Sequence, residues 1–98
     1  MLGSVKPMRS IMQTNKECFI CGSMHWLEVH HVFNASNRNK STKYGLVVYL
    51  CHWCHNEPPN GVHHNAERMR WLKAEGQKAF IKHYPNLDFF KIFGRNYL

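Results

Sequence analysis

The stretch LVVYLCHWCH, residues 46–55, decides the fold because a strand runs directly into a metal-binding turn. Its first five residues, LVVYL, form the clearest strand in the chain, since β-branched and aromatic residues favour strands. The CHWC that follows has the Cys-x2-Cys spacing of a zinc knuckle. A strand that ends on a pair of metal ligands must lie beside the segment that supplies the others.

That segment is CFIC at residues 18–21, which is followed by Gly22, as expected for a tight metal-binding turn. The two pairs, Cys18/Cys21 and Cys51/Cys54, supply four thiolates, the ligand set that suits tetrahedral Zn²⁺. Zinc binding also adds folding free energy to a 98-residue chain whose core can only be small. Because thiolates fill every position, we expect a structural zinc and not a catalytic one. The alternative is two reduced or redox-active cysteine pairs.

The zinc site predicts a β-hairpin. Residues 27–33, LEVHHVF, form a second predicted strand, and the metal joins its start to the end of the strand at 46–50. Between them, residues 34–44 are predicted to be a polar loop that carries three cations, Arg38, Lys40 and Lys43. Residues 1–16 are predicted to be a flexible arm, with DNA contact through Lys6, Arg9 and Lys16 as the alternative.

The second half of the chain is predicted to be helical. Asn65 is a suitable N-cap, apolar residues then recur at helical spacing, and Pro85 ends the helix. Gly76 interrupts this helix and should cost about 1 kcal/mol relative to Ala. The apolar residues within 87–98 predict a short helix folded back on the core. We expect one domain over residues 17–98, with a metal-binding core at about 18–65 and a helical extension at 66–98.

Charge and composition exclude several chemistries. The chain has thirteen Lys and Arg against six acids, and its only Asp is Asp88, which is expected to be structural. A carboxylate two-metal site and a Ser-His-Asp triad are therefore poor candidates, and any chemistry must depend on His and Cys. The net charge of +7 favours an anionic partner, with nucleic acid the first candidate.

The apolar segments are short. No apolar run approaches the roughly 20 residues of a membrane span, and residues 1–16 lack the apolar segment of a signal peptide. We therefore expect no membrane partner, a cytoplasmic location and reduced cysteines. The expected state is a monomer or a weak homodimer.

Histidines are the candidates for a second site. His30 and His31 are adjacent on a predicted strand, so their side chains should point to opposite faces. His55 directly follows Cys54, and therefore the second zinc knuckle determines its position. His63 and His64 precede the long helix and are close enough in sequence to fold back. The remaining three have no predicted role: His25, His52 and His83.

This order of motifs resembles the HNH endonucleases of the ββα-metal type. The similarity runs from the first cysteine pair through LEVHHVF, the polar stretch and LVVYLC to the closing Cys-His, about residues 18–65. The EPPNGVHHN stretch and the IFGRNYL ending are similar to small phage or prophage HNH proteins. The resemblance implies an α+β, ββα-metal (His-Me finger) domain, in which a four-cysteine zinc site holds a β-hairpin and a helix, with a C-terminal helical extension. It also implies a bacterial or phage-infected cell.

The resemblance implies roles for individual residues. His30 takes the place of the first metal ligand, His31 that of the general base and His55 that of the ligand after the last Cys. The motif's central Asn is absent, and either Asn37 or Asn39 could replace it. Pro58 and Pro59 break the helix that usually begins near the Cys-His, and a further ligand would then come from His63 or His64. The ligands expected for the divalent ion are His30, His55 and His63.

The implied activity is metal-assisted hydrolysis of DNA phosphodiester bonds, by nicking or by double-strand cleavage. A divalent ion (Mg²⁺, Mn²⁺, Ni²⁺, Co²⁺ or Zn²⁺) would bind the scissile phosphate, His31 would accept the proton of the attacking water, and Arg38, Lys40 and Lys43 would contact the DNA backbone. The alternatives are a zinc-stabilised DNA-binding module without catalysis and an adaptor that uses its aromatic C-terminal segment.

Overall fold

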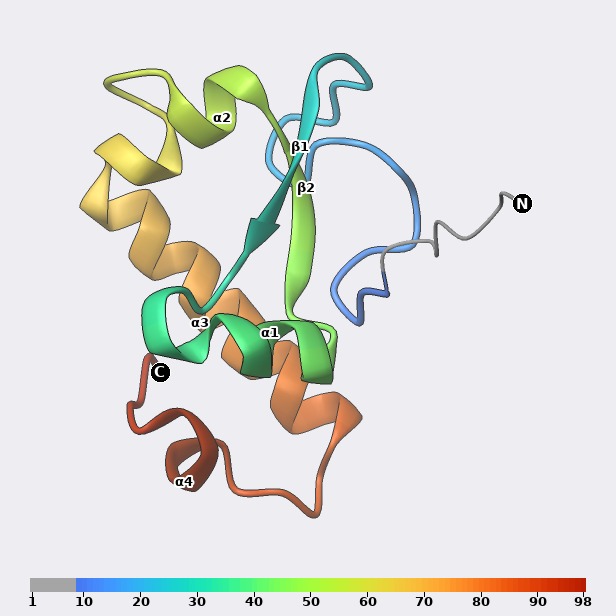
Figure 1. Ribbon diagram of the computed structural model, residues 1–98, viewed down its shortest axis with the longest axis vertical. Helices are drawn as coiled ribbons and strands as arrows, with labels where there is room; N and C mark the ends of the chain where they lie inside the picture. The colour runs from blue at the N-terminus through green and yellow to red at the C-terminus, as the bar shows by residue number, and fades with distance from the viewer. Residues whose placement is uncertain (1–8) are drawn as a thin grey trace.

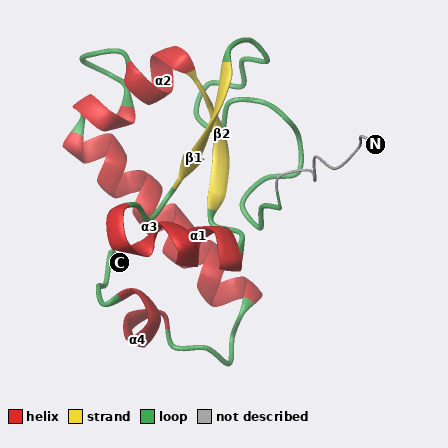
Figure 2. Ribbon diagram, in the orientation of Figure 1, coloured by secondary structure: helices red, strands yellow, loops and turns green. Residues whose placement is uncertain are grey.

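The computed structural model describes residues 9–98 (Figure 1). They form a small α+β fold, with a two-stranded antiparallel sheet and several helices (Figure 2). In the sheet, β1 (Leu27–His31) pairs with β2 (Val47–Cys51), and His30 lies opposite Val48. The helices are α1 (Arg38–Tyr44), α2 (His52–Asn56), α3 (Ala66–His83) and α4 (Phe89–Phe93), with 3-10 turns at Ala35–Asn37 and Val62–His64. The α+β class and the hairpin are as the sequence predicts.

The polar loop predicted at residues 34–44 is wrong, because this segment is helical and ends in α1. The buried Ser41 explains why. Its hydroxyl accepts a hydrogen bond from the Phe33 amide at 3.0 Å and donates one to the Phe33 carbonyl at 2.7 Å. Gly45 then ends the helix with a left-handed φ of 75°, which glycine adopts without strain. The polar composition gave no sign of α1, because Ser41 is the one residue of this helix that is buried.

The long helix α3 begins and ends as predicted. The Asn65 side chain accepts a hydrogen bond from the Arg68 amide at 3.0 Å, and the helix stops before Pro85. The helix continues through Gly76, at the point of closest approach to the segment after β1. A Cβ at this position would lie 2.9 Å from Val32 Cγ1 and 3.0 Å from Phe33 Cε2. The glycine is therefore a packing requirement of the core.

The C-terminal segment folds back on the core, as expected. The Asp88 side chain caps α4 by accepting a hydrogen bond from the Lys91 amide at 3.2 Å, which is a structural role. Phe89 and Phe93 are buried, and both rings pack against Phe33. Helix α4 and the C-terminus lie beside α1 in Figure 1. This extension encloses the side of the core that the hairpin leaves open.

The N-terminal segment is described from Arg9 onward, so most of the predicted flexible arm, including Lys6, lies outside the described residues. The described part of the arm is held against the core. Ser10 donates a hydrogen bond to the Val47 carbonyl at 2.6 Å, and the Ile11 amide donates one to the Gly45 carbonyl at 2.9 Å. Among residues 9–98, no helix has the length and apolar character needed to cross a membrane.

Candidate metal centre

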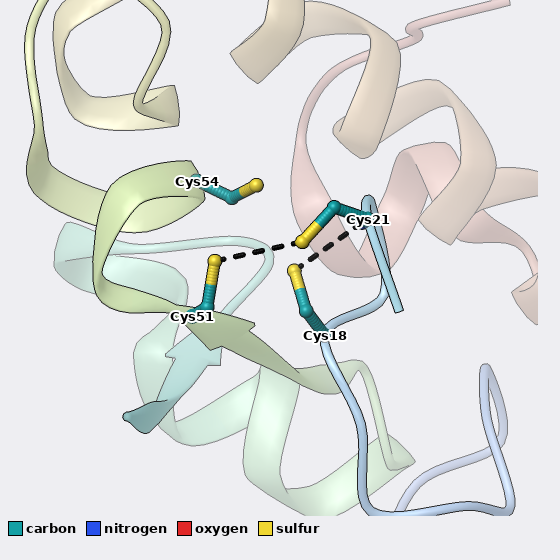
Figure 3. A group of neighbouring side chains, drawn as sticks. All are labelled: Cys18, Cys21, Cys51 and Cys54. Carbon is teal, nitrogen blue, oxygen red and sulfur yellow. Dashed lines mark hydrogen bonds between the residues drawn. The ribbon is translucent and has the colours of Figure 1, made fainter. Parts of the chain in front are cut away.

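Four cysteine thiols gather at one end of the hairpin (Figure 3). Cys18 and Cys21 come from the loop before β1, Cys51 is the last residue of β2, and Cys54 lies in α2. All four Sγ atoms lie within 4.8 Å of one another, and those of Cys21 and Cys51 are 3.7 Å apart. Bonds of about 2.3 Å at tetrahedral angles would separate ligand sulfurs by about 3.8 Å. The cluster therefore fits a zinc ion, as the spacing predicts.

The backbone around Cys18 favours its thiolate form. Burial of this thiol opposes ionisation, but hydrogen bonds from the backbone of Cys21, Cys51 and Ile20 outweigh it and lower its pKa to about 7. The turn that carries the Ile20 and Cys21 amides continues into Gly22, whose φ of 79° is left-handed. Because the thiolate is the form that binds metal, this environment prepares Cys18 as a ligand.

Three histidines form a second cluster, beside the first. His30 comes from β1, His55 from α2 and His63 from the Val62–His64 turn, and one ring nitrogen of each lies within 4.8 Å of the others. His55 Nε2 is 3.0 Å from His63 Nε2 and 3.3 Å from His30 Nδ1. Nitrogens bound tetrahedrally at about 2.0–2.1 Å would be about 3.3 Å apart. Three imidazoles at this spacing could hold a divalent cation.

The turn between α2 and α3 selects His63 and not His64. Helix α2 ends at Asn56, and the chain reverses so tightly that the Gly61 amide donates a hydrogen bond to the Glu57 carbonyl at 2.7 Å. A Cβ on Gly61 would lie 2.7 Å from the Glu57 amide nitrogen, so only glycine fits there. The reversal brings His63 to the cluster, whereas His64 is not part of it.

Burial keeps His30 neutral. Its pKa falls to about 3, mainly because the ring is buried and also because His55 and His63 lie close by. A neutral imidazole keeps a lone pair for a metal ion. Its Nε2 atom has no hydrogen-bond partner among the described residues. His30 is therefore a buried polar side chain whose surroundings favour the form that binds metal.

His31 lies at the edge of the same site. It lines a cleft of about 220 Å³ together with Arg38 and the three clustered histidines. Its pKa is lowered, first by burial and then by the nearby Arg38 guanidinium. Both effects favour the neutral form of His31 beside the cluster. Although His30 and His31 alternate along β1, as predicted, both reach this cleft.

Of the three cations predicted to bind DNA, only Arg38 lines the cleft. Lys40 Nζ donates a hydrogen bond to the Ile92 carbonyl at 2.6 Å. Lys43 Nζ lies over the Tyr44 ring, 5.3 Å from its centroid. A cation that the sequence did not suggest, Lys73 of α3, is close enough to His30 to help lower its pKa. No motif distinguished Lys73 from the other lysines of that helix.

Of the two asparagines proposed to replace the motif Asn, neither lines the cleft. Asn37 donates a hydrogen bond from Nδ2 to the Phe93 carbonyl at 3.2 Å, which joins the start of α1 to α4. Asn39 is exposed. Asn34, which the sequence interpretation did not consider, does line the cleft. It is the asparagine placed to contact whatever binds there.

Glu28 is a third residue that the sequence did not suggest. Its Oε1 atom accepts a hydrogen bond from His55 Nδ1 at 2.7 Å. Hydrogen bonds from His55 lower its pKa, with burial opposing and His52 adding to the effect. The strand period of two could have found it, because Glu28 and His30 must share a face of β1.

Comparison of the chain with family models, with curated proteins and with solved structures finds no match in any of the three.

Proposed function

We propose that this protein is a metal-dependent endonuclease of the HNH type, with a ββα-metal core, that hydrolyses DNA phosphodiester bonds. One observation carries the proposal: a cleft that joins three clustered histidines to a neutral His31 and to Arg38. The net charge of +7 supports an anionic substrate. The order β1, β2 and α2 along the chain supports the proposed ββα-metal core.

The residues of the cleft have distinct roles in this proposal. His31 accepts a proton from the attacking water, because its lowered pKa leaves it neutral near pH 7. His30, His55 and His63 hold the divalent ion, which when bound polarises the phosphate and stabilises the leaving oxygen. Arg38 binds a neighbouring phosphate oxygen, and Lys73 adds positive charge near His30.

The ligand chemistry favours some ions over others. Imidazole nitrogens suit Zn²⁺, Ni²⁺, Co²⁺ and Mn²⁺, whereas Mg²⁺ prefers oxygen ligands and keeps several waters. The three clustered side chains that face one another are all histidines. We therefore expect Ni²⁺, Co²⁺ or Mn²⁺ to support more activity than Mg²⁺.

A plasmid assay tests the proposal. The zinc-loaded protein is incubated with supercoiled, relaxed and branched DNA in Mg²⁺, Mn²⁺, Co²⁺ and Ni²⁺. We expect cleavage that His31→Ala lowers by about 10²–10⁴-fold, the usual contribution of a general base. His25→Ala is the matched control, because His25 is exposed and lies outside the cleft. Cleavage by His31→Ala at the wild-type rate would refute the assigned role.

A second candidate, a zinc-stabilised DNA-binding module without catalysis, is favoured by one observation. Asn37, one of the proposed replacements for the motif Asn, contacts Phe93 and not the cleft. This candidate predicts DNA binding with a steep salt dependence and no cleavage in any metal. Binding that is insensitive to salt would instead favour an adaptor.

A further inference from the structure

We propose that Glu28 is a positioning residue that orients His55 and sets its tautomer within the three-histidine cluster. The inference rests on the proposed metal-dependent function, because it concerns how that cluster presents its nitrogens. It assigns to Glu28 a role that acts through His55 and not through contact with substrate.

His55 is the donor in its hydrogen bond with Glu28. Glu28 Oε1 lies 2.7 Å from His55 Nδ1, and a carboxylate oxygen can only accept a hydrogen bond. Nδ1 of His55 therefore carries the proton, and in the neutral ring the lone pair is at Nε2. That is the atom that faces His63 Nε2 at 3.0 Å and His30 Nδ1 at 3.3 Å. The carboxylate thus turns the free lone pair of His55 toward the other two rings.

The second step is that Glu28 is itself held in place. Asn56 Nδ2 donates a hydrogen bond to Oε1 at 3.1 Å, and His52 Nδ1 lies 3.2 Å from Oε2. His52 Nε2 in turn lies 2.8 Å from Glu57 Oε1, so the far side of that ring is also anchored. A carboxylate contacted on both oxygens has little freedom to rotate. It can therefore fix the angle of the His55 ring as well as its tautomer.

The third step is the expected effect on metal binding. Carboxylates that hydrogen-bond a metal-ligating histidine raise its basicity and fix its direction, and their removal weakens metal binding by about 10–100-fold. Glu28→Gln keeps the shape of the side chain, but its amide can donate to Nδ1 and so favours the wrong tautomer. Glu75→Gln is the matched control, since the Glu75 carboxylate pairs with Lys78 on α3 and lies outside the Glu28 network.

The experiment measures Ni²⁺ binding to full-length, zinc-loaded protein by calorimetry. We expect Glu28→Gln to bind Ni²⁺ about 10–100-fold more weakly than wild type, with Glu75→Gln close to wild type. Histidine ¹⁵N spectra without Ni²⁺ should show His55 protonated at Nδ1 in wild type and a changed tautomer mixture in Glu28→Gln. These spectra also identify a variant that has failed to fold, in which case Glu28→Asp replaces it and should keep the Nδ1 proton.

The outcomes separate this inference from the proposed function. Equal Ni²⁺ affinity in Glu28→Gln and wild type, equal losses in both glutamine variants, or no Ni²⁺ binding by wild type would overturn the role of Glu28. If Glu28→Gln alone loses Ni²⁺ affinity while wild type cleaves no DNA in any metal, the positioning role stands and the nuclease proposal fails.

Discussion

Replacing Ser41 with Ala should destabilise the protein far more than its place in a polar segment suggests. The Ser41 side chain is fully buried, and its hydroxyl pairs with both the amide and the carbonyl of Phe33. Phe33 is also buried, at 1% exposure, so water cannot replace the lost partner. Ser41→Ala therefore leaves a buried donor and a buried acceptor unsatisfied at the end of the segment that carries His30 and His31.

The magnitude follows from these two groups. An unsatisfied buried polar group costs about 1–3 kcal/mol, whereas Ala gains roughly 0.5 kcal/mol over Ser in helix propensity. For two such groups the net loss in the free energy of unfolding should be about 2–5 kcal/mol, which lowers the melting temperature by roughly 8–40 °C in a domain of this size.

Thr42→Ala provides the control on the same helix. Its hydroxyl donates to the Arg38 carbonyl at 3.4 Å in an exposed position, so its loss should change the free energy of unfolding by no more than about 0.5 kcal/mol. Both variants are compared with wild type by urea and thermal unfolding in excess zinc. A Ser41→Ala protein as stable as Thr42→Ala would refute the argument that the hydroxyl bridge holds this segment.

Four further outcomes test the structure. Gly76→Ala should lower stability by about 1–2 kcal/mol, because the clash with Val32 and Phe33 outweighs the usual helix gain. Asp88→Ala should cost about 1 kcal/mol by urea unfolding, through loss of an N-cap. The folded pKa of His30, about 3, is below its unfolded value of 6.5, so its contribution to stability is complete above pH 6.5 and is lost as the pH falls toward 3. His30→Gln should flatten this part of the pH profile of stability, and an unchanged profile would contradict the role given to His30. A zinc chelator should lower the melting temperature of wild type, and an unchanged melting temperature would contradict a structural zinc at the cysteines.

The features that the sequence predicted well are those with short, strict spacing. Cys-x2-Cys pairs and a β-branched strand determine local geometry almost alone, so the hairpin and the cysteine cluster were predictable. His55 was placed because it directly follows Cys54. Its proximity to His30 follows once the cysteine cluster joins β1 to α2.

The features that the sequence could not supply depend on tertiary contacts. Helix α1 forms around the buried Ser41, although its composition is typical of a loop. The sequence could not tell His63 from His64 as a member of the cluster. Their positions depend on the tight reversal at Gly61, which residue propensities do not predict. Lys73 comes near His30 through the fold of α3 and not through any sequence motif. In each case a specific contact determines the structure, and the local sequence pattern does not predict that contact.

Helix α2 belongs to both clusters, and this has a consequence for maturation of the protein. Cys54 belongs to the cysteine cluster, and the next residue, His55, belongs to the histidine cluster. Cys51, at the end of β2, connects this helix to the strand. Rotation of this single short helix would displace a sulfur and a nitrogen ligand at once. An ion bound by the cysteines would therefore also fix the position of His55 in a newly made chain, and we expect zinc starvation to weaken metal binding at the histidines as well as at the cysteines.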